Sequence, residues 1–495
     1  MKNNNFKSDS RRDFFSKSGI LLAFGLAPIG LVSSAKISVK EQDLIDQKSS
    51  DLDLSELPNF CSHEHWGSIN SIGFEPSLGF RCDTTSGATP KEETSIWDII
   101  LDSYQSGGLS GSGRDPLSSA SEAGFPSQKE WWKADPSKAL KGFEKVIKSS
   151  IMTGTFQCTC RGFQMLYGID LQRFRLDEWE KADKMIRKNY EDIFSWYQQA
   201  MKKAHFTELI RPVHPEFYFQ KEASVSKQQE LSFTHTILRI DPFLDFWSQK
   251  NSRRDSLAKI AGVEPVDANS WKAFLKFYFD LAEQNHSTGI KQLQAYYRKL
   301  EYKYRDDSEV KFRGNLSKDE VIVFQDWVMH ECCSLANQKK WIHQIHVGTH
   351  NLQESNPLPL ISLGEKYPNM KIVMLHCWPF HKEAAFLAKN KSNFYIDTCW
   401  LPVLSPNFFG EALDTYLNYV PYHKIMLDHD STSVEMAVGS SMFTREILTE
   451  KLLEQQKKLQ LNAEELRGIA LDMLHNNSVR LYGIGQEIKL NEKKN

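Results

Sequence analysis

The chain has 495 residues, of which 40% are hydrophobic and 25% are charged. This composition is ample for a large buried core and excludes a disordered, low-complexity protein. The formal net charge of −2 gives no sign of a nucleic-acid partner or of attraction to an anionic membrane surface. Length alone suggests two or three domains, although α/β barrels often form one long domain.

The first 35 residues have the layout of an export signal. The pair Arg11 and Arg12 precedes an apolar run from Ile20 to Val32, and small residues at 33–35 offer a cleavage site. This layout is typical of a twin-arginine signal, so we expect the twin-arginine export machinery as a partner and the periplasm as the location. The alternative is an N-terminal membrane anchor. The run is too short to span a bilayer comfortably, so no stable membrane span is expected after signal removal.

The eight cysteines permit disulfides in an exported protein, but a chain of this length does not need them. Cys61, Cys377 and Cys399 lie in strand-like segments, and we expect buried thiols there. Cys158 and Cys160 are too close in sequence for the usual zinc pair, so we interpret them as structural.

Composition divides the rest of the chain into three parts. Residues 36–55 are polar and are predicted to be a linker, residues 56–485 a single barrel domain, and residues 486–495 a tail. A first strand is expected within 56–66. The stretch 67–204 begins rich in Gly, Ser and Pro and then shows helical periodicity. We expect it to form a loop-rich and helical insert that covers the barrel mouth.

From about residue 208 strand-like and helix-like segments alternate. Strands are expected at Glu208–Val213, Thr236–Ile240, Gly289–Leu293, Trp341–Val347, Lys371–His376, Asn393–Thr398 and Lys424–Leu427. Helices are expected at Trp271–Ala282, Lys318–Asn337, Pro357–Lys366, Lys382–Lys389 and Met442–Leu459. The alternation predicts βαβ units around a parallel sheet of about eight strands, an α/β fold of the (β/α)₈ TIM-barrel type. A doubly wound open sheet is the alternative, but no Gly-x-Gly-x-x-Gly fingerprint follows the first strand.

Chemically active side chains stand at the ends of four expected strands, where such a barrel keeps its active site. His63 and His65 end the first strand and share one face, because side chains two apart on a strand point the same way. His346 ends the fifth strand and His376 the sixth. Each signal is weak alone, since a core histidine bonded to backbone is the ordinary case.

The eighth strand ends in Asp428-His429-Asp430, whose two carboxylates share a face while His429 points away. Burying these imidazoles and carboxylates together without a partner would be costly. A shared divalent ion is the simplest partner, and three or four N/O ligands with an open position describe a catalytic metal site.

Three strings in the second half resemble the amidohydrolase-related (amidohydrolase 2) family of metal-dependent hydrolases: Lys291–Leu300, His376–Phe380 and Asn476–Gly483. They are similar in particular to amidohydrolase-like domains fused to glutamine-synthetase-like domains. The resemblance implies a TIM barrel, a divalent metal (Zn²⁺ first, one ion or two) and a small-molecule substrate.

The resemblance also implies roles for single residues. His63, His65, His346 and Asp430 would be metal ligands, and Asp430 with His376 would be catalytic. Asp428 stands where the family usually has a small residue, which leaves either carboxylate open as the ligand. Two roles are open for Lys291: it could be carboxylated and bridge two ions, or remain free and bind an anionic substrate. Tyr296 and Arg298 are further candidate substrate contacts. Arg239 and Asp241 are secondary candidates.

Three functions fit this pattern. The first is an exported hydrolase in which metal-activated water attacks the carbonyl carbon of an amide, lactone or related bond in an anionic substrate. The second is a decarboxylase or a uronate (sugar-acid) isomerase on the same barrel. The third is a non-catalytic ligand-binding export protein, which a full ligand set disfavours. The substrate itself cannot be derived from the fold.

Overall fold

The computed structural model describes residues 52–65, 74–75, 80–81, 95–100, 151–173, 175–219, 232–349 and 351–490, with four single positions between 137 and 150. The expected export signal, Cys82 and most of the loop-rich stretch after residue 65 lie outside these residues. Within the part of the chain that is described, no helix is both long and apolar enough to cross a membrane.

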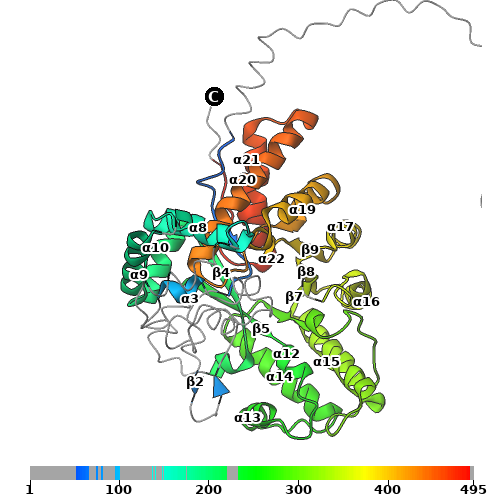
Figure 1. The fold of residues 1–495 in the computed structure, drawn as a ribbon. Coiled ribbons are helices and arrows are strands. Elements are labelled where there is room, and N and C mark those ends of the chain that lie inside the picture. The colour runs from blue at the N-terminus through cyan, green and yellow to red at the C-terminus, as the bar shows by residue number, and fades with distance from the viewer. Residues whose placement is uncertain are drawn as a thin grey trace, which may run out of the picture. The chain divides into compact units, whose positions relative to one another are not determined.

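Eight parallel strands form one curled sheet, and helices cover its outer side (Figure 1). In sheet order, which is also chain order, the strands are β1 (Asn59–Cys61), β4 (Phe206–Val213), β5 (Thr234–Arg239), β6 (Gly289–Gln292), β7 (Ile342–Val347), β8 (Lys371–His376), β9 (Phe394–Asp397) and β10 (Ile425–Met426). A short hairpin of β2 (Phe74–Glu75) and β3 (Phe80–Arg81) stands apart from this sheet. The prediction of a (β/α)₈ fold is confirmed.

Hydrogen bonds just beyond the ends of β1 and β10 join the two edges of the sheet. The backbone N–H of Asp430 donates to the carbonyl of His63 at 3.2 Å, and that of His65 donates to Ser431 at 3.2 Å. The side-chain amide of Asn59 adds a bond to the carbonyl of Leu427 at 3.2 Å. The sheet therefore closes at the same residues that carry the candidate metal ligands.

The strands of the second half form where their sequences place them because they are buried on both faces. All six residues of β7 are buried, and β8 has the same bounds as predicted. A parallel strand covered on both sides needs a nearly continuous apolar run, and β8 (Lys-Ile-Val-Met-Leu-His) supplies one. Of the polar side chains that interrupt these runs, Gln344, His346 and His376 lie inside the barrel, whereas His343 lies on its outer side against Cys333.

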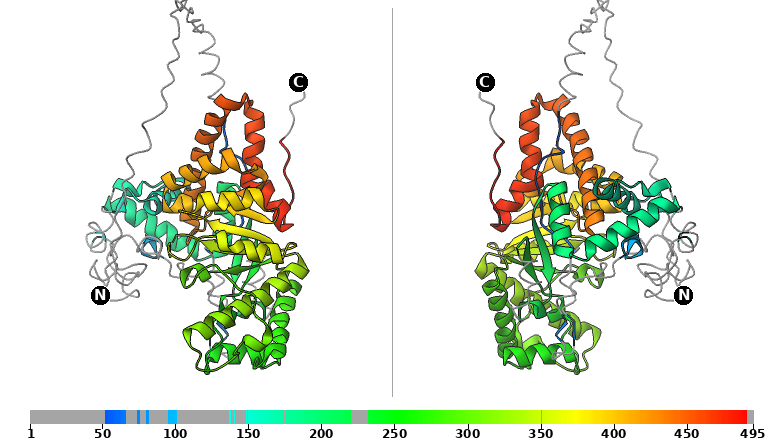
Figure 2. Two further views of the ribbon diagram at one scale, coloured as in Figure 1. Left: turned by 90° about the vertical axis from the view of Figure 1, so that its right-hand side faces the viewer. Right: turned by 90° about the vertical axis from the view of Figure 1, so that its left-hand side faces the viewer.

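Helices between the strands pack their apolar sides on the outer face of the sheet (Figures 1 and 2). The main ones are α13 (Ser252–Ala261), α14 (Ala268–Gln284), α15 (Lys318–Lys339), α16 (Ile361–Lys366), α17 (His381–Asn390) and α19 (Pro406–Tyr419). Helix α15 begins at a capping box in which Ser317 accepts from the backbone of Glu320 and Glu320 accepts from that of Ser317. That signal explains why its start was predictable.

Three helices of the expected insert pack beside the barrel: α8 (Gly154–Tyr167), α9 (Leu176–Tyr190) and α10 (Ile193–Ala204). Helix α8 contacts α20 (Val434–Leu459) so closely that a Cβ on Gly439 would lie 1.7 Å from the carbonyl oxygen of Cys158. Glycine is therefore required at this crossing. A further short helix, α3, spans Ile96–Ile100.

Helix α20 begins eight residues before the expected Met442. Its first turns bury polar side chains, among them Glu435, whose carboxylate accepts from the hydroxyls of Tyr167 at 2.6 Å and Tyr190 at 3.0 Å. A helix that buries small and polar residues lacks apolar periodicity, so its first half could not be predicted from a pattern of hydrophobic residues.

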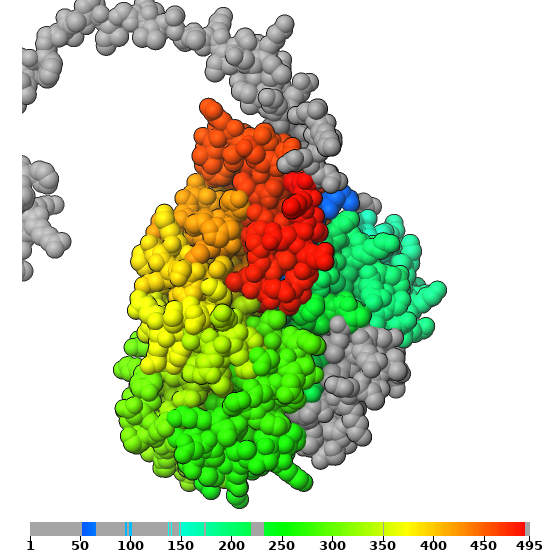
Figure 3. All heavy atoms as spheres, turned by 180° about the vertical axis from the view of Figure 1, so that it is seen from behind, coloured from blue at the N-terminus to red at the C-terminus, as the bar shows by residue number. Residues whose placement is uncertain are grey.

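The folded part begins before residue 56. Leu52 and Leu54, which lie in the expected linker, are 8% and 2% exposed and pack in the main core. At the other end, α21 (Ala463–Leu471) leads through residues 472–476 to α22 (Asn477–Tyr482). Figure 3 shows the residues near the C-terminus on the face of the molecule that lies opposite to the view of Figure 1.

Every described cysteine is a free, buried thiol. The expectation of buried thiols at Cys61, Cys377 and Cys399 is confirmed, and Cys158 and Cys160 lie within α8 as structural residues. Burial raises the pKa of each of these thiols, so the described cysteines are protonated and unreactive at neutral pH.

Candidate metal centre

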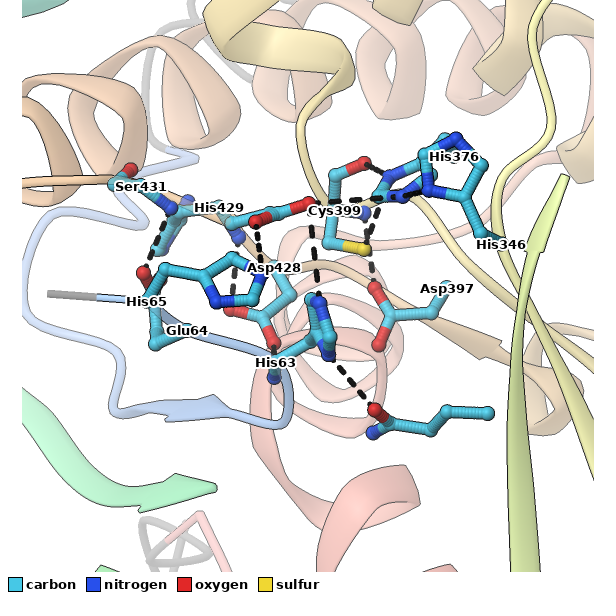
Figure 4. A network of polar contacts seen from close by, with 12 residues as sticks. His63, Glu64, His65, His346, His376, Asp397, Cys399, Asp428, His429 and Ser431 are labelled. Atoms are coloured by element: carbon cyan, nitrogen blue, oxygen red, sulfur yellow. Dashed lines mark hydrogen bonds and ion pairs between the residues drawn. The ribbon is translucent and has the colours of Figure 1, made fainter. Parts of the chain in front are cut away.

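His63, His65 and Asp430 bring three ligand atoms together at the closure of the barrel. These atoms all lie within 4.8 Å of one another. His65 Nε2 is 3.2 Å from Asp430 Oδ1, and His63 Nε2 is 3.9 Å from Asp430 Oδ2. Figure 4 shows the two histidines side by side, both from the segment that follows β1. Of the two carboxylates left open by the sequence, Asp430 is the one that faces this pair.

Burial keeps both imidazoles in the neutral form that metals bind. Desolvation, followed by the nearby charge of Lys291, holds the pKa of His63 and of His65 well below the usual range. His63 Nε2 and His65 Nδ1 are buried and have no hydrogen-bond partner among the described residues. Neutral imidazoles beside a carboxylate form a donor set that fits a divalent ion.

His346 and His376 form a second pair across the barrel mouth. His346 Nδ1 lies 3.0 Å from His376 Nε2, and their ring centroids are 4.4 Å apart. His376 Nε2 is also 3.6 Å from Asp430 Oδ2, so Asp430 lies between the two histidine pairs. The remote nitrogen of each ring is anchored, that of His376 at the carbonyl of Cys399 (2.8 Å) and that of His346 at Thr349 Oγ1 (2.8 Å).

These residues could hold one ion at His63, His65 and Asp430, and His376 and Cys399 form a second group of possible ligands with the same Asp430. The structure therefore brings together three of the four expected metal ligands, His63, His65 and Asp430, with His376 next to Asp430. It places His346 against His376 rather than against His63 and His65 (Figure 4).

Lys291 lies inside the barrel on β6, the fourth strand. It is fully buried, and its Nζ has no hydrogen-bond partner among the described residues. Burial lowers the pKa of Lys291 to about 8, although the charges of Asp430 and Asp241 oppose the shift. A buried ammonium without a partner next to a metal centre suits binding of an anion.

Tyr296 lies near the centre, because its ring centroid is 4.5 Å from that of His346. Arg298 does not. Its guanidinium donates to Asp326 Oδ1 at 2.6 Å, to the carbonyl of Glu301 at 2.8 Å and to Gln325 at 3.2 Å, against helix α15. The structure thus places Arg298, expected as a substrate contact, against helix α15, just after the turn Gln294–Tyr296 that follows β6.

Further buried carboxyl groups lie beneath the ligands. Asp428 accepts from the backbone N–H of His63 and, at 3.0 Å, from Ser62 Oγ, which is also 2.6 Å from Asp397 Oδ2. Burial raises the pKa of Asp397 to about 6 and, with the charge of Asp397, raises that of Asp428 well above its usual range. Asp428 thus supports the first-strand segment from within the protein. His429 points away, as expected, to Asn59 and Ser440.

Sequence reasoning gave no role to Gln344, which bonds His63 Nδ1 at 2.7 Å, or to Cys399, whose thiol lies with His376 and Asp430. Gln344 stands two residues before His346 on β7, so its side chain lies on the same face, one layer deeper. That spacing was the available signal for Gln344.

A cavity of about 350 Å³ opens at the same end of the barrel, lined by residues that include Arg239, Asp241 and Tyr297.

A (β/α)₈ barrel with histidine and aspartate side chains at the ends of its first, fifth, sixth and eighth strands is typical of a metal-dependent enzyme of the hydrolase fold. Comparison with known proteins agrees. Residues 310–484 match the family model described as amidohydrolase. Protein fluG of Emericella nidulans is 27% identical over 175 residues, which make up 33% of this chain and 20% of that protein. The chain thus spans only a small part of this curated relative's length.

Solved structures share the fold across most of the chain. Uronate isomerase from Thermotoga maritima matches with a TM-score of 0.64 and 15% identity, over 89% of this chain and 96% of that one. A structure described as a metal-dependent hydrolase from Lactobacillus casei matches with a TM-score of 0.56 and 15% identity, over 88% of this chain and 98% of that one. At this identity the likeness is one of fold alone.

Proposed function

We propose that the protein hydrolyses an amide, lactone or related carbonyl-type bond in a small anionic substrate, with Zn²⁺ held by His63, His65 and Asp430. One observation carries this proposal: ligand atoms of the buried His63 and Asp430 and of the half-buried His65 all lie within 4.8 Å of one another. A bound divalent ion would supply an activated water, because it lowers the pKa of water from about 15.7 to about 7.

Asp430 is placed to take up the proton of the attacking water. Its Oδ1 faces His65 at 3.2 Å and its Oδ2 faces His376 Nε2 at 3.6 Å. A proton accepted by Asp430 can therefore pass to His376, which lies on the far side of the same carboxylate and can protonate the leaving group. The bond from His376 Nδ1 to the carbonyl of Cys399 keeps Nε2 directed into the site for this transfer.

Lys291 would bind the anionic part of the substrate. Its ammonium is buried inside the barrel with no described hydrogen bond to compensate for the burial, and a carboxylate would supply one. Tyr296, in contact with His346, would line the same space. The alternative proposal is a carboxylated Lys291 bridging two ions, in which case the anion would have to bind elsewhere in the mouth.

Turnover in ¹⁸O-labelled water tests the hydrolase proposal. Metal-loaded protein is screened against lactones, dipeptides, uronates and aromatic acids, and a hydrolysis product must carry the label. Asp430→Asn and His376→Asn should lower the rate about 100-fold or more, since positioned proton transfer contributes on that order. His343→Gln is the matched control, because His343 is buried behind the sheet against Cys333. Full turnover by Asp430→Asn would contradict the proposed roles.

Isomerisation of a sugar acid is the second candidate. The fold likeness to uronate isomerase extends over 89% of this chain and thus includes described parts of the insert as well as the barrel. The same screen separates the two reactions. The isomerase proposal would be favoured, and the hydrolase proposal overturned, if a uronate were converted without forming a bond to water oxygen and no lactone or dipeptide gave a labelled product.

A further inference from the structure

A chain of hydrogen bonds runs through the barrel interior from the closing helix α22 to a metal ligand. Gln344 Nε2 donates to the hydroxyl oxygen of Tyr482 at 2.6 Å and to the carbonyl of Ser62 at 2.8 Å. Gln344 Oε1 lies 2.7 Å from His63 Nδ1. Ser62, His63 and Gln344 are each 0% exposed and Tyr482 is 4% exposed, so water does not compete for these bonds.

The partners of Gln344 determine which way its amide points. A backbone carbonyl can only accept a hydrogen bond, so the atom that faces Ser62 must be the amide nitrogen, and the amide oxygen must face His63. That oxygen is itself only an acceptor, so Nδ1 of His63 must carry the ring proton. The lone pair is then on Nε2, which is the nitrogen directed at Asp430.

Without Gln344 the other tautomer would be favoured. A proton on Nε2 of His63 would face the carboxylate of Asp430, whose Oδ2 is 3.9 Å away, and this attraction would stabilise it. Such a proton occupies the lone pair that a metal needs. Gln344 opposes that outcome because its buried oxygen would lose its donor if Nδ1 were deprotonated.

Tyr482 in turn positions Gln344. Its ring stacks on Phe60 of β1 at a centroid distance of 6.1 Å, within the apolar cluster that fills the barrel interior. Its hydroxyl therefore has a fixed place next to Gln344, one layer below the ligands. Figure 4 shows His63 at the centre of the polar network that this chain of bonds enters.

We propose that Gln344 is a positioning residue that sets the tautomer of His63, and that Tyr482 holds it, so that α22 contributes to the affinity for metal. The importance of this for catalysis rests on the proposed function. The tautomer itself is a property of the metal-free protein.

The test is a two-bond ¹H–¹⁵N correlation spectrum of metal-free protein labelled with ¹⁵N-histidine. The expected result is that wild-type His63 is protonated at Nδ1, and that Gln344→Met moves the proton wholly or partly to Nε2. Zn²⁺ affinity, measured by competition with a chromophoric chelator, should fall about 10–100-fold in Gln344→Met, as for other residues that orient metal ligands. Tyr482→Phe, which keeps the ring, should give a smaller fall.

Two further variants separate positioning from general loss of packing. Gln344→Glu keeps an acceptor opposite Nδ1 and should retain the wild-type tautomer. Gln292→Met removes a buried glutamine of the neighbouring strand β6 and should leave both measurements unchanged. A wild-type His63 protonated at Nε2, or a Gln344→Met protein with unaltered tautomer and affinity, would overturn the proposal. If the tautomer responds as expected while wild-type protein binds no Zn²⁺, the proposed function and the contribution of α22 to metal affinity fail, and only the effect of Gln344 on the tautomer of His63 stands.

Discussion

Replacing Arg298 by Met should destabilise the fold without removing the metal centre. The guanidinium of Arg298 pairs with Asp326 Oδ1 at 2.6 Å, and the two side chains are 6% and 1% exposed. Breaking a buried ion pair by removing one partner costs about 3–5 kcal/mol. Asp326 keeps two bonds to Arg305, at 3.0 and 3.1 Å, so we expect a loss of about 3 kcal/mol in the free energy of unfolding, at the low end of that range.

Urea denaturation followed by circular dichroism measures this loss, and elemental analysis of the same sample measures bound metal. Lys299→Met is the matched control, because that side chain is 61% exposed and its pair with Glu301 is 4.0 Å long. Its effect should stay within about 0.5 kcal/mol. An Arg298→Met protein as stable as wild type, with weakened binding of an anionic substrate, would refute the structural role and restore Arg298 as a substrate contact.

Two other predictions concern helix packing and export. Gly439→Ala should lower the free energy of unfolding in urea by about 3 kcal/mol or more, because its Cβ would lie 1.7 Å from the carbonyl oxygen of Cys158. Gly468→Ala, whose Cβ would have no atom within 4 Å, should raise it by about 0.5–1 kcal/mol. Equal effects at the two sites would contradict the close crossing of α8 and α20. We also propose that Arg11 and Arg12 direct twin-arginine export, so that replacing both by Lys should leave the protein in the cytoplasm in fractionation of expressing bacteria, and unchanged periplasmic delivery would refute this.

The second half of the fold was predictable because its signals are local. Strand β8 is a short apolar run with a polar residue at each end, and α15 starts at a capping box that the letters Ser317 to Glu320 display. The strand-end positions of His346 and His376 followed from those bounds. The contact of His346 with His376, and of His376 with Asp430, follows from the barrel, in which all strand ends of one kind meet.

Other features depend on contacts between distant segments, which local patterns do not contain. Strand β1 has only three residues, and its place is set by pairing with β4 and by the bonds of Asn59 to Leu427 and Leu474. Arg298 follows a strand end in sequence, but its partner Asp326 is 28 residues away on a helix. The role of Gln344 likewise requires Tyr482, 138 residues further along the chain.

Metal content of the purified protein tests the central claim most directly. Elemental analysis of wild type, reconstituted with Zn²⁺ and freed of excess, should find about one divalent ion per chain at a site of three protein ligands. His63→Ala and Asp430→Ala should lose it, while His343→Gln, altered behind the sheet, should retain it. Wild-type protein that holds no ion after reconstitution, or a His63→Ala protein that holds as much as wild type, would contradict the account.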